Sequence, residues 1–252
     1  MGPIFVGTHD LTHSKVASLR DPEYRKKYEQ AYYEDLNKYG QELTLDRANK
    51  KFLTQRMTRS LVIRLWKKAC SGEPHKKVSG TEASLMKFVE QLPRKPLSKE
   101  ELLKLNRYIL NPEDVDVDIV IKDPFERGEI AEIIYAEKLP TVRLWIHFKD
   151  YLIGGTPDGV AESYVYEFKS TMQTDRRLEA IKTMAVRQAL IYAHAFSRPN
   201  IKVQVAQFHK HKFPIKVKDL PKPEMSTITK AASQHEALGI LREFDLAFRG
   251  PS

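Results

Sequence analysis

Cysteine is almost absent from this sequence. Cys70 is the only one among 252 residues, so the chain cannot form an intramolecular disulfide, a zinc site built from CxxC pairs, or an iron–sulfur cluster held by several of its own thiolates. A single thiol is typical of proteins in a reducing compartment. We therefore expect an intracellular protein, cytoplasmic or nucleoid-associated and not secreted.

Long apolar runs and an acidic surplus are missing too. No run of about 18 apolar residues occurs, and the stretch MGPIFVGTHDLTHSK lacks a basic region followed by a long apolar one, so neither a membrane span nor a secretion signal is predicted. The 42 Lys and Arg exceed the 33 Asp and Glu, which gives a formal charge of +9. That balance favours a polyanionic partner, and we expect nucleic acid rather than a membrane.

The expected elements change character near residue 126. Before it, hydrophobic periodicity and capping signals predict mostly helices, over 22–38, 46–69, 81–92 and 99–110, followed by a strand or extended link over 114–119. After it, helices and strands alternate. The expected helices are 127–139, 175–196 with Thr174 as its cap, and 226–249; the expected strands are 141–148, 151–157, 163–170, 201–208 and 213–218. This order favours an α/β (α+β) fold with a central mixed sheet flanked by helices.

The residues that carry chemistry lie on two of these strands. Asp158 follows Pro157, and Glu167-Phe168-Lys169 comes after eight intervening residues. Residues two apart on a strand share a face, so Glu167 and Lys169 project together, while Phe168 points into the core and offers only its backbone carbonyl. The short turn over 159–163 predicts a hairpin that brings Asp158 beside Glu167.

This set of groups suits a divalent cation. Two carboxylates and a main-chain carbonyl are hard oxygen ligands for Mg²⁺ or Mn²⁺, which can lower the pKa of a bound water. Lys169 would orient that water and stabilise negative charge. A Glu-x-Lys tripeptide alone is usually a solvated strand face. Here the strand around it is apolar and aromatic, and Pro157-Asp158 precedes it at a hairpin distance.

Three motifs follow one another in this half: GTPD at 155–158, EFK at 167–169 and QALIY at 188–192. In this pattern the chain resembles the RecB-type branch of the PD-(D/E)XK nuclease superfamily, which includes the CRISPR adaptation nucleases and shows GxxD, ExK and QxxxY. The resemblance implies a restriction-endonuclease-like core and a Mg²⁺- or Mn²⁺-dependent deoxyribonuclease. It also implies that Gln188 and Tyr192 lie near the DNA-facing side of the site. For Tyr192, an ordinary core position is an equal alternative.

An upstream helix adds a third carboxylate to the prediction. The branch shows a GxxxH element there, and Gly128 to Glu132 matches its spacing with Glu132 in place of the histidine. The resemblance implies that Glu132 is a metal ligand and part of the catalytic site, with Glu129 as the alternative. A Glu early in a helix also simply stabilises the helix dipole. Asp21 stands where many members place a cysteine, so we expect no iron–sulfur cluster.

The resemblance covers the chain unevenly. It predicts an N-terminal segment of the core over 1–29, a mostly helical insertion or cap over 30–122, and the nuclease core over 123–252. Between residues 47 and 68 eight side chains are basic and none is acidic. These side chains either bind phosphates or are solvent-exposed residues of a helix that buries its apolar face. The expected nucleic-acid contacts are Arg56, Arg59, Arg64, Lys67, Arg176, Arg177, Arg187 and Lys210.

Three functions remain open from the sequence. The first is a metal-dependent nuclease that hydrolyses DNA, rather than RNA, at ends or on single strands. The second is a phage-type recombination exonuclease with the same chemistry, expected as a ring-shaped homo-oligomer. The third is a nucleic-acid-binding protein on an inactive nuclease scaffold. The intact trio of Asp158, Glu167 and Lys169 argues against the third, because an inactive site would be free to lose one of them.

Overall fold

The computed structural model describes residues 3–12, 21–39, 120–137, 139 and 143–249. Within these ranges the chain is a mixture of helices and of sheets with both parallel and antiparallel pairs, as the sequence predicts. The helices expected at 46–69, 81–92 and 99–110 lie outside the described residues, as do Arg56, Arg59, Arg64 and Lys67. No helix in the described ranges is long and apolar enough to cross a membrane.

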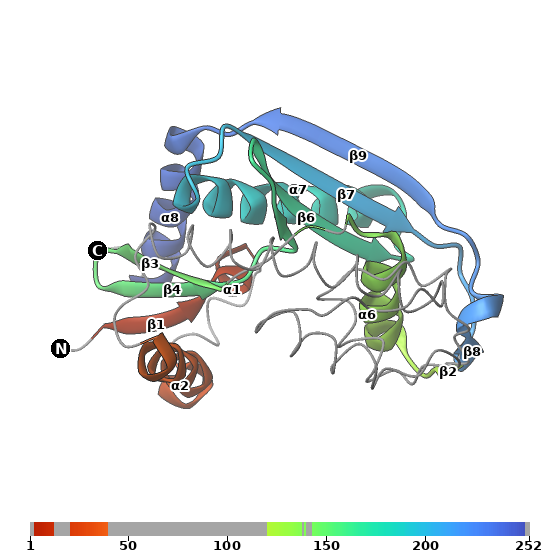
Figure 1. Ribbon diagram of the computed structural model, residues 1–252, viewed down its shortest axis with the longest axis horizontal. Coiled ribbons are helices and arrows are strands. Elements are labelled where there is room, and N and C mark those ends of the chain that lie inside the picture. The colour runs from red at the N-terminus through yellow and green to blue at the C-terminus, as the bar shows by residue number, and fades with distance from the viewer. Residues whose placement is uncertain (1–2, 13–20, 40–119, 138, 140–142, 250–252) are drawn as a thin grey trace, which may run out of the picture.

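A three-stranded sheet joins the start of the chain to its middle (Figure 1). Its order is β1-β4-β3, with β1 (Ile4–Gly7), β4 (Tyr151–Gly155) and β3 (Leu144–Phe148). Strand β1 runs parallel to β4, whereas β3 is antiparallel to it. Helix α1 (Thr8–Thr12) follows β1 directly, and α2 (Pro22–Tyr39) packs against β1. The sequence did not predict β1, because four apolar residues are too few to show a period.

A four-stranded sheet carries the motif residues. Its order is β5-β6-β7-β9, with β5 (Gly159–Val160), β6 (Tyr164–Thr171), β7 (Asn200–Gln207) and β9 (Glu224–Ala231). Strands β6 and β7 are parallel, and the other pairs are antiparallel. A separate pair joins β2 (Val120–Ile121) to β8 (Ile215–Lys216), which a 3-10 turn (Val217–Asp219) follows. The strand expected over 213–218 is thus only two residues long.

Two helices cover opposite faces of this sheet. On one face, Val165, Val203 and Val205 pack against alanines and Ile191 of α7 (Asp175–Ala195). On the other face, Tyr166 and Phe168 pack near Ala131 of α6 (Pro124–Tyr135), which lies beneath β6 and β7 in Figure 1. Because both faces are covered, the first part of β6 carries buried apolar side chains on both sides, Val165 on one and Tyr166 on the other, which is typical of buried strands. Helix α8 (Gln234–Arg249) packs on α7.

Helix α6 differs in its bounds from the helix expected over 127–139. The Asp123 side chain accepts hydrogen bonds from the backbone N–H groups of Phe125 and Glu126, with Pro124 at the first helical position, so the helix begins at Pro124. It ends at Tyr135, before Leu139. Thr174 does stand at the N-cap of α7, but its hydroxyl bonds the Asp175 carboxylate and caps no backbone N–H.

The helix expected over 226–249 is wrong in its first third. Residues Glu224–Ala231 form β9, which pairs with β7 along its whole length, and the helix begins only at Gln234. The β-branched Thr227, Ile228 and Thr229 favour a strand. Pairing with β7 also provides hydrogen bonds for backbone groups that would otherwise bond to water. Helix α2 runs through the boundary expected after residue 29. Most of the segment 30–122 lies outside the described residues, so the division into 1–29, 30–122 and 123–252 stays a prediction.

Candidate active site

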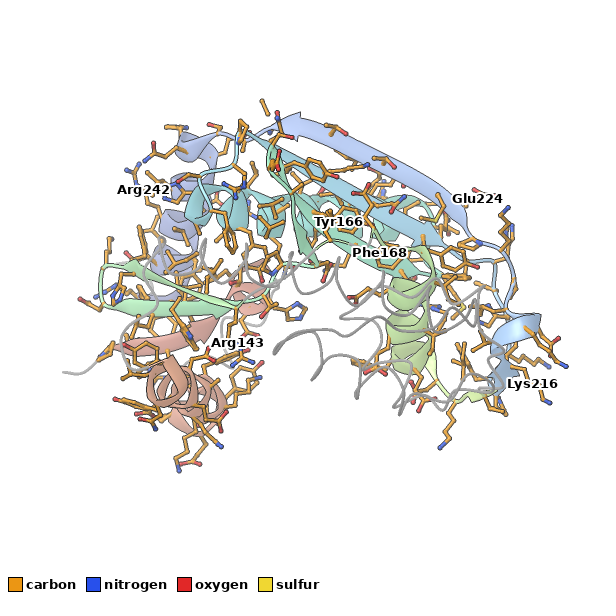
Figure 2. All side chains as sticks on the ribbon, viewed as in Figure 1. Arg143, Tyr166, Phe168, Lys216, Glu224 and Arg242 are labelled. Atoms are coloured by element: carbon orange, nitrogen blue, oxygen red, sulfur yellow. The ribbon has the colours of Figure 1, made fainter. Side chains whose placement is uncertain are left out.

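Asp158 lies at the turn between β4 and β5, beside the free edge of β6. The predicted hairpin is confirmed, since β5 pairs antiparallel with β6 at Tyr166 and Val165. The next backbone N–H on that edge, that of Phe168, donates to Asp158 Oδ2 at 2.7 Å. In a strand the N–H and C=O of one residue point to the same side, so the Phe168 carbonyl faces Asp158 as well. The Phe168 side chain points towards α6, next to Tyr166 (Figure 2).

Glu167 and Lys169 project from the opposite face of β6. The Lys169 ammonium forms an ion pair with Glu167 Oε1. The Glu167 side chain is 1% exposed and that of Lys169 is 28% exposed. The site therefore combines a dry carboxylate with an ammonium that reaches towards solvent, and Asp158 joins them from the neighbouring turn.

Burial and mutual repulsion shift the pKa values of this trio. Burial and the charge of Asp158 raise the pKa of Glu167 to about 8, although Lys169 opposes the shift. Burial also raises the pKa of Asp158, against the pull of Lys169 and the Phe168 N–H. For Lys169, burial lowers the pKa, but Glu167 and Asp158 outweigh it and the net pKa is raised. The positive charge of Lys169 is thus too small to offset the burial and mutual repulsion of the two carboxylates, and a bound cation would supply the rest.

One atom tests whether these groups fit a metal ion. Glu167 Oε2 is buried and has no hydrogen-bond partner. An acceptor left without a partner in a dry site is costly, and a cation relieves that cost. In the described part of the chain no group of three or more His, Cys, Asp and Glu side chains is arranged to hold a metal. Asp158, Glu167 and the Phe168 carbonyl nevertheless are oxygen donors of the type that Mg²⁺ and Mn²⁺ prefer.

Glu132 lies within electrostatic reach of the trio. Its charge contributes to raising the pKa of Glu167 and of Lys169, after the larger effects of burial and of the closer charges. It stands on α6, half-buried, whereas Glu129 one turn earlier is exposed. Glu132 therefore is better placed than Glu129 as a third carboxylate, and its role as a ligand stays a prediction.

Gln188 and Tyr192 are buried on α7. Gln188 Nε2 lies 3.5 Å from the Tyr192 hydroxyl, and both side chains are less than a tenth exposed. Burial, then the charge of Glu167, raises the pKa of Tyr192. A Cβ on Gly155 would meet the Tyr192 hydroxyl at 2.5 Å, so this tyrosine fills the space under the motif glycine. Its observed contacts are those of a core residue that borders the site.

Two buried polar residues of α1 that the sequence did not single out bond to neighbouring elements, Thr8 to the end of β4 and Asp10 to α2. Thr8 Oγ1 donates to the Gly154 carbonyl at 3.1 Å, and Asp10 accepts hydrogen bonds from the hydroxyls of Tyr24, at 3.0 Å, and Tyr28. Thr8 and Asp10 are each 1% exposed. Their only signal is a Thr-His-Asp triplet after a short apolar run, which is too common to identify a site.

The predicted basic contacts separate in space. Arg176 and Arg177 are exposed at the start of α7, and Lys210 is exposed in the loop after β7. Strands β6 and β7 are parallel, so their C-terminal ends lie at the same end of the sheet. The start of α7 follows β6 and the loop with Lys210 follows β7, so all three basic residues lie at that end. Arg187 lies farther along α7 and forms an ion pair of 2.6 Å with Glu243 of α8. The structure thus groups three of the four described candidates.

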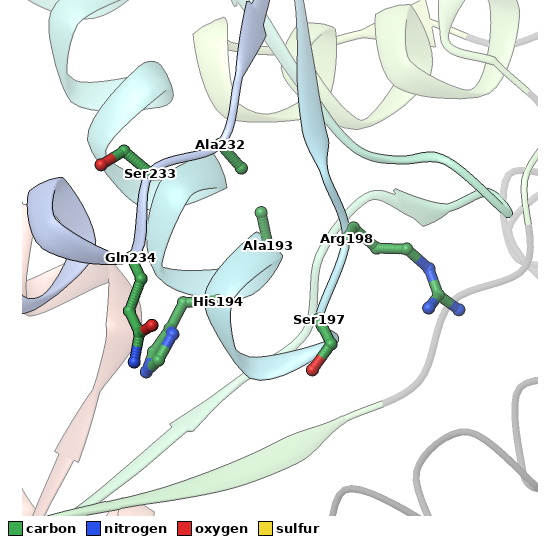
Figure 3. Close-up of a pocket in the computed structure, with 7 residues that line it drawn as sticks. All are labelled: Ala193, His194, Ser197, Arg198, Ala232, Ser233 and Gln234. Atoms are coloured by element: carbon green, nitrogen blue, oxygen red, sulfur yellow. The ribbon is translucent and has the colours of Figure 1, made fainter.

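A surface pocket of about 300 Å³ lies elsewhere, where the end of α7 meets the start of α8 (Figure 3). His194 and Gln234 lie side by side in it, whereas the Arg198 side chain points away and bonds the carbonyls of Ala161 and Phe196. None of Asp158, Glu167 and Lys169 lines this pocket. It is separate from the candidate active site.

Comparison with known proteins gives no family. No protein-family model matches the chain, and no curated protein matches it. Among solved structures, "Crystal structure of SSO0001" is 15% identical over 77% of this chain and 88% of that one, with a TM-score of 0.32. Rai1 of Scheffersomyces stipitis, solved with (3'-NADP)+ and a calcium ion, is 12% identical over 79% of this chain and 60% of that one, with a TM-score of 0.24. Likenesses this weak carry no argument about function.

Proposed function

We propose that this protein is a Mg²⁺- or Mn²⁺-dependent nuclease with a restriction-endonuclease-like core that hydrolyses DNA phosphodiester bonds, at ends or on single strands. The observation that carries the proposal is the buried, unpartnered Glu167 Oε2 beside a second, half-buried carboxylate, Asp158. The motif resemblance described above supports the choice of DNA. The paired Lys169 supports hydrolysis rather than simple cation storage, because a storage site gains nothing from an ammonium next to its ligands.

Each residue then has a defined task. Asp158, Glu167 and the Phe168 carbonyl would hold the cation, with Glu132 as a further carboxylate within electrostatic reach. The bound cation would lower the pKa of a water and offset charge on the phosphate. Once Glu167 gives its oxygens to the cation, the Lys169 ammonium is free to orient the attacking water and to stabilise the developing negative charge. Tyr192 and Thr8 hold the β4 end against α7 and so fix Asp158 in place.

The test is cleavage of end-labelled DNA by the purified chain. Linear and circular, single- and double-stranded substrates are incubated with Mn²⁺, Mg²⁺ or EDTA, and products are resolved on denaturing gels. We expect cleavage with Mn²⁺ or Mg²⁺ and none with EDTA. Lys169→Ala should reduce the rate by about 10²–10³, the usual cost of losing one electrostatic donor.

The matched control is Lys230→Ala. Lys230 is also an ion-paired lysine on the same sheet, but it lies on β9, pairs with Glu236 of α8 and is 43% exposed. This variant should cleave as fast as the wild type. Equal cleavage by wild type and Lys169→Ala, or no cleavage by either, would overturn the proposal. If DNA binding survives without cleavage, the chain is a binding protein on an inactive scaffold.

A further inference from the structure

Arg127, in the first turns of α6, is a buried cation with unused hydrogen-bond donors. The residue is 4% exposed, and its Nε and Nη1 have no hydrogen-bond partner. Nη2 has only a long contact, 3.5 Å, with the Ser170 carbonyl. The guanidinium lies over the Phe208 ring, 5.4 Å from its centroid. An aromatic face compensates a buried cation in part, but it satisfies none of the N–H donors.

Among the residues that the structure describes, no acid offsets this charge in the way that acids offset other arginines. Burial alone lowers the pKa of Arg127. By contrast, Arg249 bonds Asp245 and Asp150 at 2.7 Å each, and Arg187 bonds Glu243. A buried charge that is neither paired nor fully hydrogen-bonded is strongly destabilising. Such a group is expected where the protein binds an anion that supplies the missing charge and hydrogen-bond acceptors.

The position of Arg127 relates it to the candidate metal site. The Tyr164 carbonyl accepts a hydrogen bond from the Ala161 N–H, so it faces the β5 side of β6. Every second residue of a strand directs its carbonyl to the same edge, so the carbonyls of Phe168 and Ser170 face this side as well. The Ser170 carbonyl, which Arg127 contacts, is therefore about 7 Å along this edge from the Phe168 carbonyl beside Asp158. A group held by Arg127 would be an immediate neighbour of a group held by Asp158 and Glu167.

We propose that Arg127 binds the phosphate adjacent to the scissile one, with Nε and Nη1 donating to its non-bridging oxygens. The inference rests on the proposed nuclease function and adds a phosphate subsite to it. A guanidinium presents two parallel N–H donors that match a phosphate, which an ammonium cannot do. Both nitrogens are closed to solvent in this structure, so a strand must open the edge beside Ser170 before it binds.

Binding can be measured without cleavage. Fluorescently labelled single-stranded oligonucleotides, each with one neutral methylphosphonate at a different linkage, are titrated with the protein in Ca²⁺. We expect the affinity of the wild type to fall by about 10- to 100-fold for one linkage position, the worth of charge-assisted hydrogen bonds to a phosphate. Arg127→Gln should bind the unmodified strand with an affinity about 10- to 100-fold below that of the wild type. A methylphosphonate at the critical linkage should not reduce the affinity of this variant further.

Three controls make the result decisive. Arg242→Gln removes an exposed arginine on α8, far from Phe168 in Figure 2, and should keep the wild-type pattern. Arg127→Met keeps the length without the charge and should melt at or above the wild-type temperature, because an uncompensated buried charge is gone. A purely structural Arg127 would instead lower the melting temperature of Arg127→Met.

The outcomes separate the two proposals. If Arg127→Gln binds the unmodified strand like the wild type, or if it remains as sensitive as the wild type to the critical methylphosphonate, the phosphate subsite is wrong. That result leaves the nuclease proposal intact as long as cleavage still depends on Lys169. If the wild type does not cleave in Mn²⁺ yet shows the Arg127-dependent linkage, Arg127 is a phosphate-binding residue, but the nuclease proposal fails and with it the position of this phosphate beside a scissile one.

Discussion

At the residue scale, Glu167 combines function with a cost in stability. Its side chain is almost completely buried, one of its oxygens has no partner, and its nearest cation is shared with Asp158. Active sites commonly keep such unfavourable arrangements because the ligand, not the fold, completes them. The same residue should therefore limit stability when no cation is bound.

Glu167→Gln should stabilise the metal-free protein and abolish cleavage. The pKa of Glu167 is raised from 4.5 to about 8, so ionising this carboxyl costs stability that grows as the pH rises between those values. The melting temperature of the variant should match the wild type at pH 5 and exceed it at pH 8, by about 2–4 °C for each kcal/mol removed. Calorimetry in EDTA measures this difference.

Two comparisons check that interpretation. Glu243→Gln changes an exposed glutamate on α8, 64% exposed, and should give no gain that depends on pH. Mn²⁺ should raise the melting temperature of the wild type but not that of Glu167→Gln, because only the wild type binds the ion. A variant that melts below the wild type at pH 8 in EDTA would contradict the account of Glu167.

Which single residues the sequence revealed depends on spacing. Asp158, Glu167 and Lys169 were predictable, since strand periodicity and a short turn fix how they can meet. Arg127 was not, because its significance is the absence of a partner in three dimensions. Thr8 contacts Gly154 across 146 positions of sequence, and no local pattern encodes such a contact.

At the element scale, the end of β4 is packed as closely as glycine permits. A Cβ on Gly155 would lie 2.2 Å from Thr8 Oγ1 and 2.5 Å from the Tyr192 hydroxyl. These groups belong to α1 and α7, so three elements meet at this glycine. Any side chain there must push them apart and move the turn that carries Asp158.

Gly155→Ala should lower the free energy of unfolding by about 1–3 kcal/mol, the usual cost of an overpacked core, and reduce cleavage. Chemical denaturation measures the first effect and the gel assay the second. Gly239→Ala is the matched control. Nothing lies within 4 Å of a Cβ at Gly239 in α8, so alanine should stabilise the protein by about 0.5–1 kcal/mol through helix propensity. Equal effects at both glycines would contradict the close packing of Gly155.

Elements were predictable where periodicity and end signals agreed, as for α7 and β6. They were not where tertiary pairing decided. Residues 226–231 read as the start of a helix because the apolar seam of α8 can be extended backwards through them, but β7 offers eight partners for a strand at that place. The start of α6 was placed too late because the capping Asp123 precedes the expected helix, although Asp-Pro is a readable start signal.

At the scale of the whole molecule, one carboxylate joins the last helix to the first sheet. Asp245 of α8 accepts hydrogen bonds from Lys149, from the Tyr151 hydroxyl at 2.8 Å and from Arg249 Nε at 2.7 Å. Lys149 and Tyr151 belong to the turn and strand of the β3–β4 hairpin. Burial raises the pKa of Asp245, but these bonds outweigh it and hold the pKa at about 2.

Acid should loosen this connection. Because the pKa of Asp245 falls from 3.8 to about 2 on folding, its contribution is complete above about pH 5 and is lost as the pH drops from about 5 to 1. Asp245→Asn should cost about 1–2 kcal/mol at pH 7 and less than about 0.5 kcal/mol at pH 2, measured by urea denaturation. Asp150→Asn, at an aspartate 67% exposed that also bonds Arg249, should cost less than about 1 kcal/mol. A constant difference across this pH range would exclude the Asp245 carboxylate as its source.

The class of the fold was predictable, whereas its assembly was not. Alternating helices and strands indicated a mixed α+β protein, and the described residues are one. The division of the strands into separate sheets, and the parallel partnership of β1 with β4, depend on contacts between distant segments. Both faces of β6 are buried because α6 and α7 cover them, and these helices lie before and after β6 in the chain.

The pairing of β1 with β4 has a consequence for synthesis on the ribosome. Ile4 pairs with Tyr151, so the partner of β1 leaves the ribosome only after 147 further residues have been made, roughly 7–30 s later at ordinary elongation rates. During that interval an apolar strand without its partner is a target for chaperones or for other nascent chains. The N-terminal strand should therefore be the part of this sheet most dependent on help during translation.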